Sequence, residues 1–374
     1  MTADLVSTWF QTNAIAPPRL DRRALFRLPG ADLDLRTNDA ELRAGLMETL
    51  THHLVRSPLR SDERPAPVRL ELSSVTGEQA PRGILFPLKR SGGEWTRLPA
   101  RAGAERGSRF VHFRLGGTEA LWRPIDMLAA FSPGGGTLKI LALQGAPKTR
   151  LLHARPGAIA KIGIEIDVLV NLILILHVRA FGMFCLHAAS LADRGRGVLL
   201  VGPSGCGKTT TAAALMRGGF TLLSDEITAV AAGGDGETRI EGILFPPRLC
   251  GPAKPELETL EAGLGFERTD NKHALRLEPA IARRGIGRAV PPRAVLFLEL
   301  PAGRPSRHEL IPADEGEGFE RLLGQVLDPT MAAQPQRILV GLCALLDGCP
   351  YYRLRLGTDL GSLPELVRGA LASR

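Results

Sequence analysis

Short apolar runs and alternating apolar and polar residues recur along the chain, and both patterns are typical of β-strands. In the first 150 residues the expected strands cover 68–75, 83–89, 109–115 and 138–143, with Gly- and Pro-rich turns between them. Residues 1–30 carry no such pattern, and we expect an extended, loosely held segment there. These elements predict a smaller, mixed α+β accessory domain over residues 1–155, which carries no catalytic pattern of its own.

One helix is expected inside that domain, over residues 38–56, because leucine recurs at every fourth position from Leu42 to Leu54. Asn38 or Asp39 can cap its first turn. Two histidines, His52 and His53, lie at its end. Adjacent residues of a helix point in different directions, so we predict a solvated helix end here rather than a metal site.

From residue 156 onward, strands alternate with helices. An apolar helix near 159–182 leads to two strands at 184–192 and 198–201, whose short connection at 193–196 predicts a hairpin. Further strands are expected at 220–223, 292–300 and 350–356, and further helices at 318–328, 335–348 and 363–372. This alternation predicts an α/β domain over residues 156–374.

A phosphate-binding motif lies between the strand at 198–201 and a helix-prone stretch. Residues 202–209 read GPSGCGKT, which is the G-x-x-x-x-G-K-[ST] pattern of a phosphate-binding loop (P-loop). Its glycines let backbone N–H groups turn toward an anion, and the dipole of the following helix adds positive potential. Lys208 can reach the β- and γ-phosphates of a nucleoside triphosphate, and the Thr209 hydroxyl can bind Mg²⁺. The residues expected to contact the nucleotide are Gly202, Pro203, Ser204, Gly205, Cys206, Gly207, Lys208, Thr209 and Thr210.

An acidic pair, Asp225 and Glu226, follows the short strand expected at 220–223. Ligands of open α/β sheets gather at the carboxyl ends of the strands. A carboxylate there can hold Mg²⁺ or accept the proton of an attacking hydroxyl. A solvated strand end is the alternative, and the proximity to the P-loop favours the functional interpretation.

The composition narrows the choice of partner and compartment. The net charge is +8, and most of the basic excess lies in residues 1–150, but only 5% of the residues are aromatic and no basic run is interleaved with them. We therefore expect no nucleic-acid partner. The five cysteines have no zinc spacing, the N-terminus lacks the order of a signal peptide, and the most apolar stretch contains polar residues. These features predict a cytoplasmic protein without a membrane partner.

Residues 186–230 resemble the catalytic domain of HPr kinase/phosphorylase and its kinase-like relatives, a wider group that includes phosphoenolpyruvate carboxykinase. The shared features are a strand with Leu186-His187, a hairpin, the P-loop, a helix that ends near Gly218, and a short strand that ends at Asp225-Glu226. Glu226 stands where the family has a second aspartate, and RIEG at 239–242 is a faint match to a second family signature. The resemblance implies an α/β P-loop kinase domain of the HPr kinase/phosphoenolpyruvate carboxykinase type.

The resemblance also implies an activity, in which ATP and Mg²⁺ are used to phosphorylate a serine of a protein or peptide acceptor. Asp225 would be the general base, and Thr209, Asp225 and Glu226 would hold Mg²⁺. His187 would lie near the active site, with a buried core histidine as an equal alternative. Further candidates for contacting the transferred phosphate, each with a surface salt bridge as alternative, are Arg248, Lys272 and Arg353.

Two other functions stay open at this point, a small-molecule kinase of the same fold and a nucleotide-binding regulatory module without catalysis. A homo-oligomer is possible, because members of the family often form oligomers. No interface can be read from the sequence.

Overall fold

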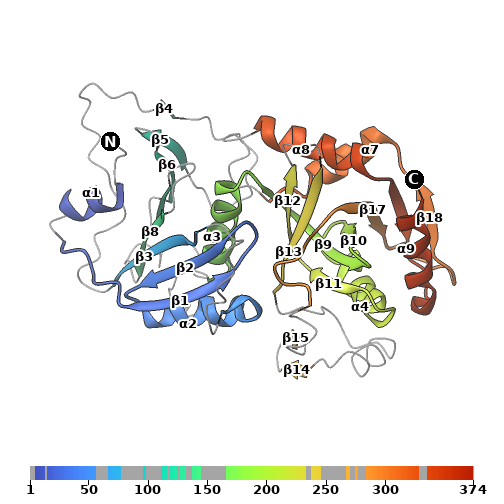
Figure 1. The fold of residues 1–374 in the computed structure, drawn as a ribbon, viewed down its shortest axis with the longest axis horizontal. Coiled ribbons are helices and arrows are strands. Elements are labelled where there is room, and N and C mark those ends of the chain that lie inside the picture. The colour runs from blue at the N-terminus through green and yellow to red at the C-terminus, as the bar shows by residue number, and fades with distance from the viewer. Residues whose placement is uncertain are drawn as a thin grey trace, which may run out of the picture.

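The computed structural model is an α/β protein with two mixed sheets (Figure 1). The structure describes residues 5–12, 15–55, 66–76, 96–97, 111–115, 118–123, 127–131, 137–144, 166–232, 237–245, 267–269, 274–276, 284–327 and 335–373. The strand expected at 83–89 lies outside these residues, as do Arg248 and Lys272.

The N-terminal sheet has eight strands in the order β1-β2-β3-β8-β7-β6-β5-β4. The strands are β1 (Arg22–Arg27), β2 (Asp32–Thr37), β3 (Val68–Thr76), β4 (Thr96–Arg97), β5 (Val111–Leu115), β6 (Thr118–Arg123), β7 (Met127–Phe131) and β8 (Thr137–Gln144). β2 is parallel to β3, and β3 to β8, while the other neighbours are antiparallel. The expected strands at 68–75, 109–115 and 138–143 are confirmed as β3, β5 and β8 within a few residues.

The start of the chain differs from the expectation of a loosely held segment. It forms helix α1 (Leu5–Thr12) and strand β1. Arg23 of β1 donates to the carboxylate of Asp34 at 2.6 Å, and Arg36 lies 3.4 Å from the same carboxylate. Asp34 is nearly buried, so the basic stretch is needed to neutralise a carboxylate inside the sheet. The sequence pattern did not show this because the partner lies on the next strand.

Helix α2 (Ala40–Thr49) confirms most of the helix expected at 38–56, and a 3₁₀ turn, η1 (Thr51–His53), follows it. Asp39 is the N-cap, and its Oδ1 accepts hydrogen bonds from the backbone N–H groups of Glu41 and Leu42, both at 2.9 Å. Asn38 instead bonds to the backbone of Ser74. The prediction of a solvated end is wrong for His53, which is 1% exposed, because η1 packs against the second sheet.

The second sheet has nine strands and carries the P-loop. Its order is β16-β13-β12-β9-β10-β17-β19-β18, and β11 also pairs with β9. The strands are β9 (Phe184–Asp193), β10 (Arg196–Val201), β11 (Thr221–Ser224), β12 (Ile227–Ala232), β13 (Thr238–Ile243), β16 (Ala289–Val290), β17 (Pro292–Glu299), β18 (Glu309–Pro312) and β19 (Tyr351–Arg355). A separate pair, β14 (Glu267–Thr269) and β15 (Ala274–Arg276), lies apart from it.

Helices cover both faces of this sheet. Residues of α4 (Lys208–Arg217) and α9 (Leu363–Ala372) share one core with β10 and β17, and residues of α8 (Pro335–Gly348) share another core with the opposite face. The other helices within the described residues are α3 (Ile166–Ala180), α7 (Glu315–Leu323) and the 3₁₀ turn η4 (Leu360–Ser362). The helices expected at 335–348 and 363–372 are confirmed as α8 and α9, and α7 begins a few residues before the expected 318–328.

The two sheets share a hydrophobic core across α3. Buried residues of β1, β2, α2 and α3 belong to the same cluster as Phe245, which follows β13, and four residues of the second sheet, namely Cys185, Ile227, Ala229 and Ile243. Figure 1 shows α3 between the two halves. The N-terminal unit, meaning the described residues up to Gln144, is therefore packed directly onto β9, β12 and β13, of which β12 follows the acidic pair.

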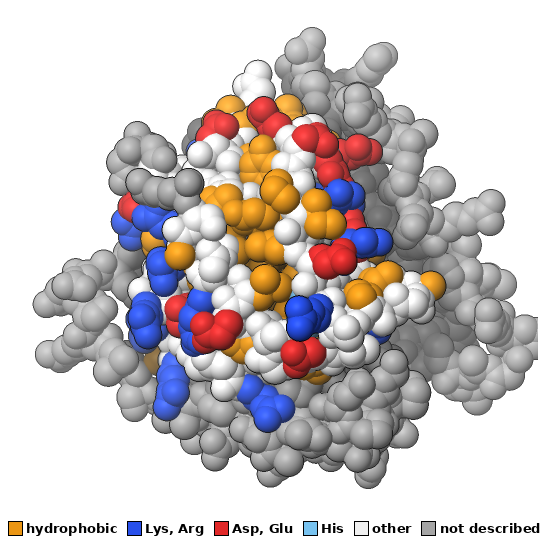
Figure 2. Space-filling view, turned by 90° about the vertical axis from the view of Figure 1, so that its right-hand side faces the viewer, with side chains coloured by type: hydrophobic (Ala, Val, Ile, Leu, Met, Phe, Trp, Pro, Cys, Tyr) orange, Lys and Arg blue, Asp and Glu red, His pale blue; other side chains and the backbone are white. Residues whose placement is uncertain are grey.

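The far end of the second sheet is formed by β18. Figure 2 shows this side of the molecule, with apolar side chains gathered in the middle of the face and acidic and basic side chains around them. Pro312 ends β18 and has no backbone N–H group to offer another strand, a common way to blunt a sheet edge. Among the described helices, none combines the length and apolar character that a membrane crossing requires.

Candidate active site

The strand–loop–helix unit of the P-loop follows directly from the local sequence. β9 and β10 form the expected antiparallel hairpin, and its turn places Arg194 (φ 49°) and Gly195 (φ 81°) in left-handed conformations. β10 is fully paired, antiparallel to β9 and parallel to β17. The chain therefore leaves the carboxyl end of a central strand at Gly202, where ligands of α/β sheets bind.

The loop conformation depends on its glycines. Gly205 and Gly207 have φ angles of 82° and 100°, which residues with a side chain rarely adopt. A Cβ atom on Gly202 would lie 2.7 Å from Sγ of Cys206 and 3.3 Å from the carbonyl oxygen of Leu298. Pro203, Ser204 and Gly205 are exposed, so the crest of the loop is open to a ligand.

Helix α4 begins at Lys208, and no side chain caps its first turn. The backbone N–H groups of that turn consequently have no side-chain acceptor at the N-cap. The Nζ atom of Lys208 donates to the carbonyl oxygens of Gly202 and Pro203, at 2.7 and 3.1 Å. Thr209 and Thr210 follow on the first turn and are half-buried. This is the geometry of an anion-binding site, in which the Lys208 side chain folds back onto the loop.

The other end of α4 holds the helix in place. Gly219 has a φ angle of 91°, and the N–H of Phe220 donates to the carbonyl of Leu215 at 3.1 Å, as in a Schellman motif. Arg368 of α9 donates to the carbonyl oxygen of Gly218 and stacks 5.2 Å above the ring of Phe220. The helix end expected near Gly218 is confirmed, with Gly218 as the C-cap.

The acidic pair lies in the turn between β11 and β12. Both strands pair with β9, so the turn is held beside the strand that carries His187. Asp225 is nearly buried, whereas Glu226 is exposed. The turn itself is organised by Ser224, whose Oγ accepts hydrogen bonds from the N–H groups of Glu226 and Ile227 at 3.1 and 2.9 Å.

His187 lies between the P-loop and the acidic turn. It pairs with Ile227 at the start of β12, and its neighbour Ala188 pairs with Val201 at the end of β10. The backbone N–H of His187 donates to the carbonyl of Gln325 at 2.7 Å. Burial lowers the pKa of the imidazole, and the positive charge of Lys208 lowers it further. His187 is consequently neutral at pH 7 and offers hydrogen bonds rather than a charge.

Lys208 connects these groups electrostatically. Burial lowers its pKa, and the groups of Cys206, Glu226 and Asp225 act in the opposite direction. Burial raises the pKa of the Cys206 thiol, and the nearby Lys208 charge opposes that increase. The structure thus places Lys208 and His187 near the adjacent residues Asp225 and Glu226, as the sequence predicts.

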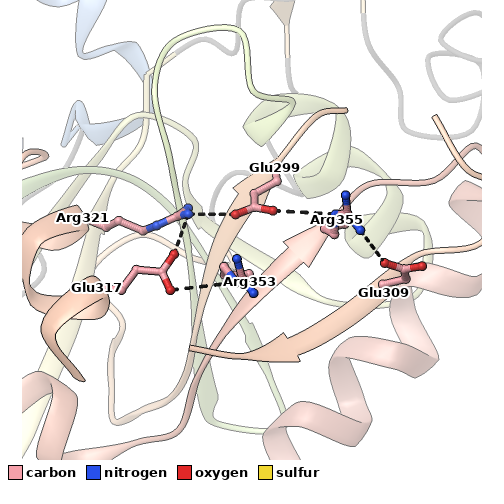
Figure 3. Close-up of polar contacts among 6 residues, drawn as sticks. All are labelled: Glu299, Glu309, Glu317, Arg321, Arg353 and Arg355. Carbon is pink, nitrogen blue, oxygen red and sulfur yellow. Dashed lines mark hydrogen bonds and ion pairs between the residues drawn. The ribbon is translucent and has the colours of Figure 1, made fainter. Parts of the chain in front are cut away.

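A second group of charges lies along the carboxyl ends of β17 and β19 (Figure 3). Arg321 of α7 contacts Glu299 at 2.8 Å and Glu317 at 2.7 Å, and its guanidinium lies 5.6 Å from the centre of the Phe297 ring. The network alternates three arginines with three carboxylates, namely Glu299, Glu309, Glu317, Arg321, Arg353 and Arg355. It begins one residue after Leu298, whose carbonyl borders Gly202, and therefore braces the strand ends beside the P-loop.

Arg353 had been expected either to contact phosphate or to form a surface salt bridge. Its Nε lies 3.9 Å from the carboxylate of Glu317. The sequence does not predict structural roles for Ser224 and the glutamates of this network, or the burial of His53. The Ser-Asp-Glu run before a strand is a turn signal from which Ser224 could have been identified. Nothing local in the sequence indicates the role of His53 or of the glutamates.

The described residues also fit a magnesium ion that is held partly by phosphate. They contain no group of three or more His, Cys, Asp and Glu side chains placed to hold a metal by themselves. Mg²⁺ usually takes one or two carboxylates together with substrate phosphates. The set of Thr209, Asp225 and Glu226 agrees with that chemistry, since the acidic turn acts on the Lys208 ammonium at the loop.

The fold and site together define an α/β protein with mixed sheets, in which a P-loop faces an acidic turn. No family model matches the chain, and no curated protein matches it. Among solved structures, the chain is similar to the HPr(Ser) kinase/phosphatase from Coxiella burnetii, with 12% identity, a TM-score of 0.26, and coverage of 50% of this chain and 93% of that one. A TM-score this low says nothing about the activity of this chain.

Proposed function

We propose that this protein is a kinase that uses ATP and Mg²⁺ to phosphorylate a serine hydroxyl of a protein or peptide. The observation that carries the proposal is the strand pairing: β9, which carries His187, pairs with β10 before the P-loop and with β11 and β12 on either side of Asp225 and Glu226. Phosphoryl transfer needs positioning and charge stabilisation more than covalent chemistry, and this arrangement provides both.

Each residue has a defined part in the proposed reaction. The backbone N–H groups of the loop and the Lys208 ammonium hold the phosphates, with Lys208 exchanging its carbonyl partners for phosphate oxygens. Asp225 accepts the proton of the serine hydroxyl as the serine oxygen bonds to the γ-phosphorus. The bond from that phosphorus to the β,γ-bridging oxygen breaks, and ADP leaves with the electron pair. The neutral His187 orients groups by hydrogen bonding beside Lys208.

Thr209, Asp225 and Glu226 would hold Mg²⁺, which when bound neutralises part of the charge on the phosphates. Glu226 is exposed and reaches further than an aspartate, so it suits an outer contact to the ion. Asp225 is the better general base because it is nearly buried beside Lys208.

The experiment compares phosphate transfer from labelled ATP to serine-containing peptides and proteins for the wild type, Asp225→Asn and Asp347→Asn. Asp347 is an exposed carboxylate of α8 and serves as the matched control. We expect Asp225→Asn to lower transfer by roughly 100-fold or more, the usual contribution of a general base, while ATP binding persists. Asp347→Asn should behave as the wild type.

Three outcomes would contradict the proposal. Transfer at the wild-type rate by Asp225→Asn would remove Asp225 as the base. Tight ATP binding without transfer to any acceptor would favour a regulatory module. Transfer confined to small molecules would favour the small-molecule kinase. The serine-bearing acceptor, the cytoplasmic location and the possible homo-oligomer stay predictions.

A further inference from the structure

One peptide group links the N-terminal unit to the acidic turn. It is the peptide between Ile243, the last residue of β13, and Leu244. Its carbonyl oxygen accepts a hydrogen bond from Oγ of Ser224 at 2.9 Å, and its N–H donates to Nε2 of His53 at 2.8 Å. The planar 243–244 peptide is thus hydrogen-bonded on one side to Ser224, the residue before Asp225, and on the other side to His53 of the N-terminal unit.

The His53 end of this link is fixed by burial and by tautomer. Because Nε2 accepts from Leu244, the ring proton must lie on Nδ1, which donates to the carbonyl oxygen of Arg27 at 2.7 Å. Both ring nitrogens are therefore satisfied by the backbone of two different sheets. A water molecule could replace neither bond easily, since the side chain is almost completely buried.

The Ser224 end reaches the catalytic turn directly. Ser224 is fully buried, and its hydroxyl both donates to Ile243 and accepts from Glu226 and Ile227. Gly242 permits the close approach, because a Cβ atom there would lie 2.1 Å from the backbone of Leu223. Hydrogen bonds in such a chain polarise one another, so loss of the first bond weakens the next.

We propose that His53 and Ser224 are positioning residues, through which the N-terminal unit sets the conformation of the Asp225-Glu226 turn. The inference rests on the proposed kinase function for its effect on transfer, but the coupling itself is a property of the fold. It gives the N-terminal unit a defined task, which its sequence alone did not indicate.

The experiment measures hydrogen exchange of the Glu226 and Ile227 amides in the full-length chain. His53→Asn keeps a donor near Arg27 but loses the acceptor for Leu244, whereas the longer His53→Gln can still accept from Leu244. His177→Asn is the matched control, because His177 is also a buried histidine of this part of the molecule and its Nε2 lies 3.0 Å from the carbonyl of Pro29. That contact joins α3 to the segment before β2 and does not involve the 243–244 peptide.

We expect His53→Asn to accelerate exchange of both amides by about tenfold, which corresponds to the net contribution of one hydrogen bond. Exchange should change little in His53→Gln and in His177→Asn. Equal acceleration in His53→Asn and His177→Asn, or none in either, would overturn the coupling. Should His53→Asn fail to fold, Ser224→Ala tests the same link from the other end. That change should accelerate exchange of the Leu244 amide, and unchanged exchange there would overturn the proposal.

Activity then separates this inference from the proposed function. If the chain is a kinase, His53→Asn should lower kcat by about tenfold without changing ATP affinity, and His53→Gln should restore it. A wild type without transfer activity would contradict the kinase proposal alone, since the exchange measurement still decides the coupling. Faster exchange with unchanged kcat would contradict the positioning role.

Discussion

Gly242 of β13 lies so close to Leu223 of β11 that a Cβ atom at this glycine would come within 2.1 Å of the carbonyl carbon of Leu223. The clash is with backbone, which cannot move as a flexible side chain can. We predict that Gly242→Ala lowers the free energy of unfolding by at least about 2 kcal/mol, the range of overpacking in well-packed sites.

Gly303→Ala is the control for that change, because a Cβ atom there meets nothing within 4 Å. It should stay within about 0.5 kcal/mol of the wild type in urea unfolding. Equal effects of the two alanines would show that β13 does not press on the acidic turn.

The loop glycine Gly205 offers a second matched pair. Gly205 and Gly195 have φ angles of 82° and 81°, and a Cβ atom on either meets nothing within 4 Å. Alanine at either site should lower the free energy of unfolding by roughly 1–2 kcal/mol, because a residue with a Cβ atom is strained in the left-handed conformation. Only Gly205→Ala places a methyl group at the phosphate site, so calorimetry should show weaker ATP binding for that variant. Equal ATP affinity in both variants would argue against phosphate at the crest of the loop.

The pH dependence of stability should reflect His53. The pKa of His53 is lowered from 6.5 to about 4, mainly by burial and also by the charge of His52, while the hydrogen bond to the carbonyl oxygen of Arg27 acts in the opposite direction. Between about pH 4 and pH 6.5, the imidazole of His53 is protonated in the unfolded chain but not in the folded chain. Stability is therefore fully present above pH 6.5 and is lost as the pH falls toward 4, by up to about 3 kcal/mol.

Urea unfolding at a series of pH values tests this. His53→Gln cannot titrate, so its unfolding free energy should fall less steeply over the same interval. An identical slope in the variant and the wild type would mean that another group carries the dependence.

The arginines of the network in Figure 3 should differ in their contribution to stability. Arg321 has two carboxylates within 2.8 Å and an aromatic ring beneath it, whereas the nearest carboxylate to Arg355 is at 3.1 Å and its side chain is more exposed. We expect Arg321→Ala to cost about 1–2 kcal/mol and Arg355→Ala less than about 1 kcal/mol. Thermal unfolding at low and high salt measures both, and a larger loss for Arg355→Ala would contradict the ranking.

The elements that the sequence predicted well are those with local causes. The P-loop, the hairpin before it and the cap at Gly218-Gly219 each depend on residues within a few positions of one another. Helices α8 and α9 show a clear apolar periodicity. Such features are set by backbone conformation and short-range contacts, so the sequence carries them directly.

The elements that it missed have distant causes. His53 is buried where it bonds to Leu244, and the basic stretch around Arg23 forms a strand that pairs with β2 and supplies a counter-charge to Asp34. The importance of Ser224 depends on the carbonyl of Ile243. None of these partners can be identified from a single sequence, because tertiary packing decides between a solvated and a buried histidine.

We propose that the P-loop binds the phosphates of ATP through Lys208, and a calorimetric titration with ATP and Mg²⁺ tests this binding. Lys208→Ala removes the ammonium, and Lys139→Ala, in the N-terminal sheet, is the matched lysine control. We predict that the wild type and Lys139→Ala bind alike, while Lys208→Ala binds roughly 10- to 100-fold more weakly, the value of one charged hydrogen-bonding group. No binding by the wild type, or equal binding by all three proteins, would contradict the account.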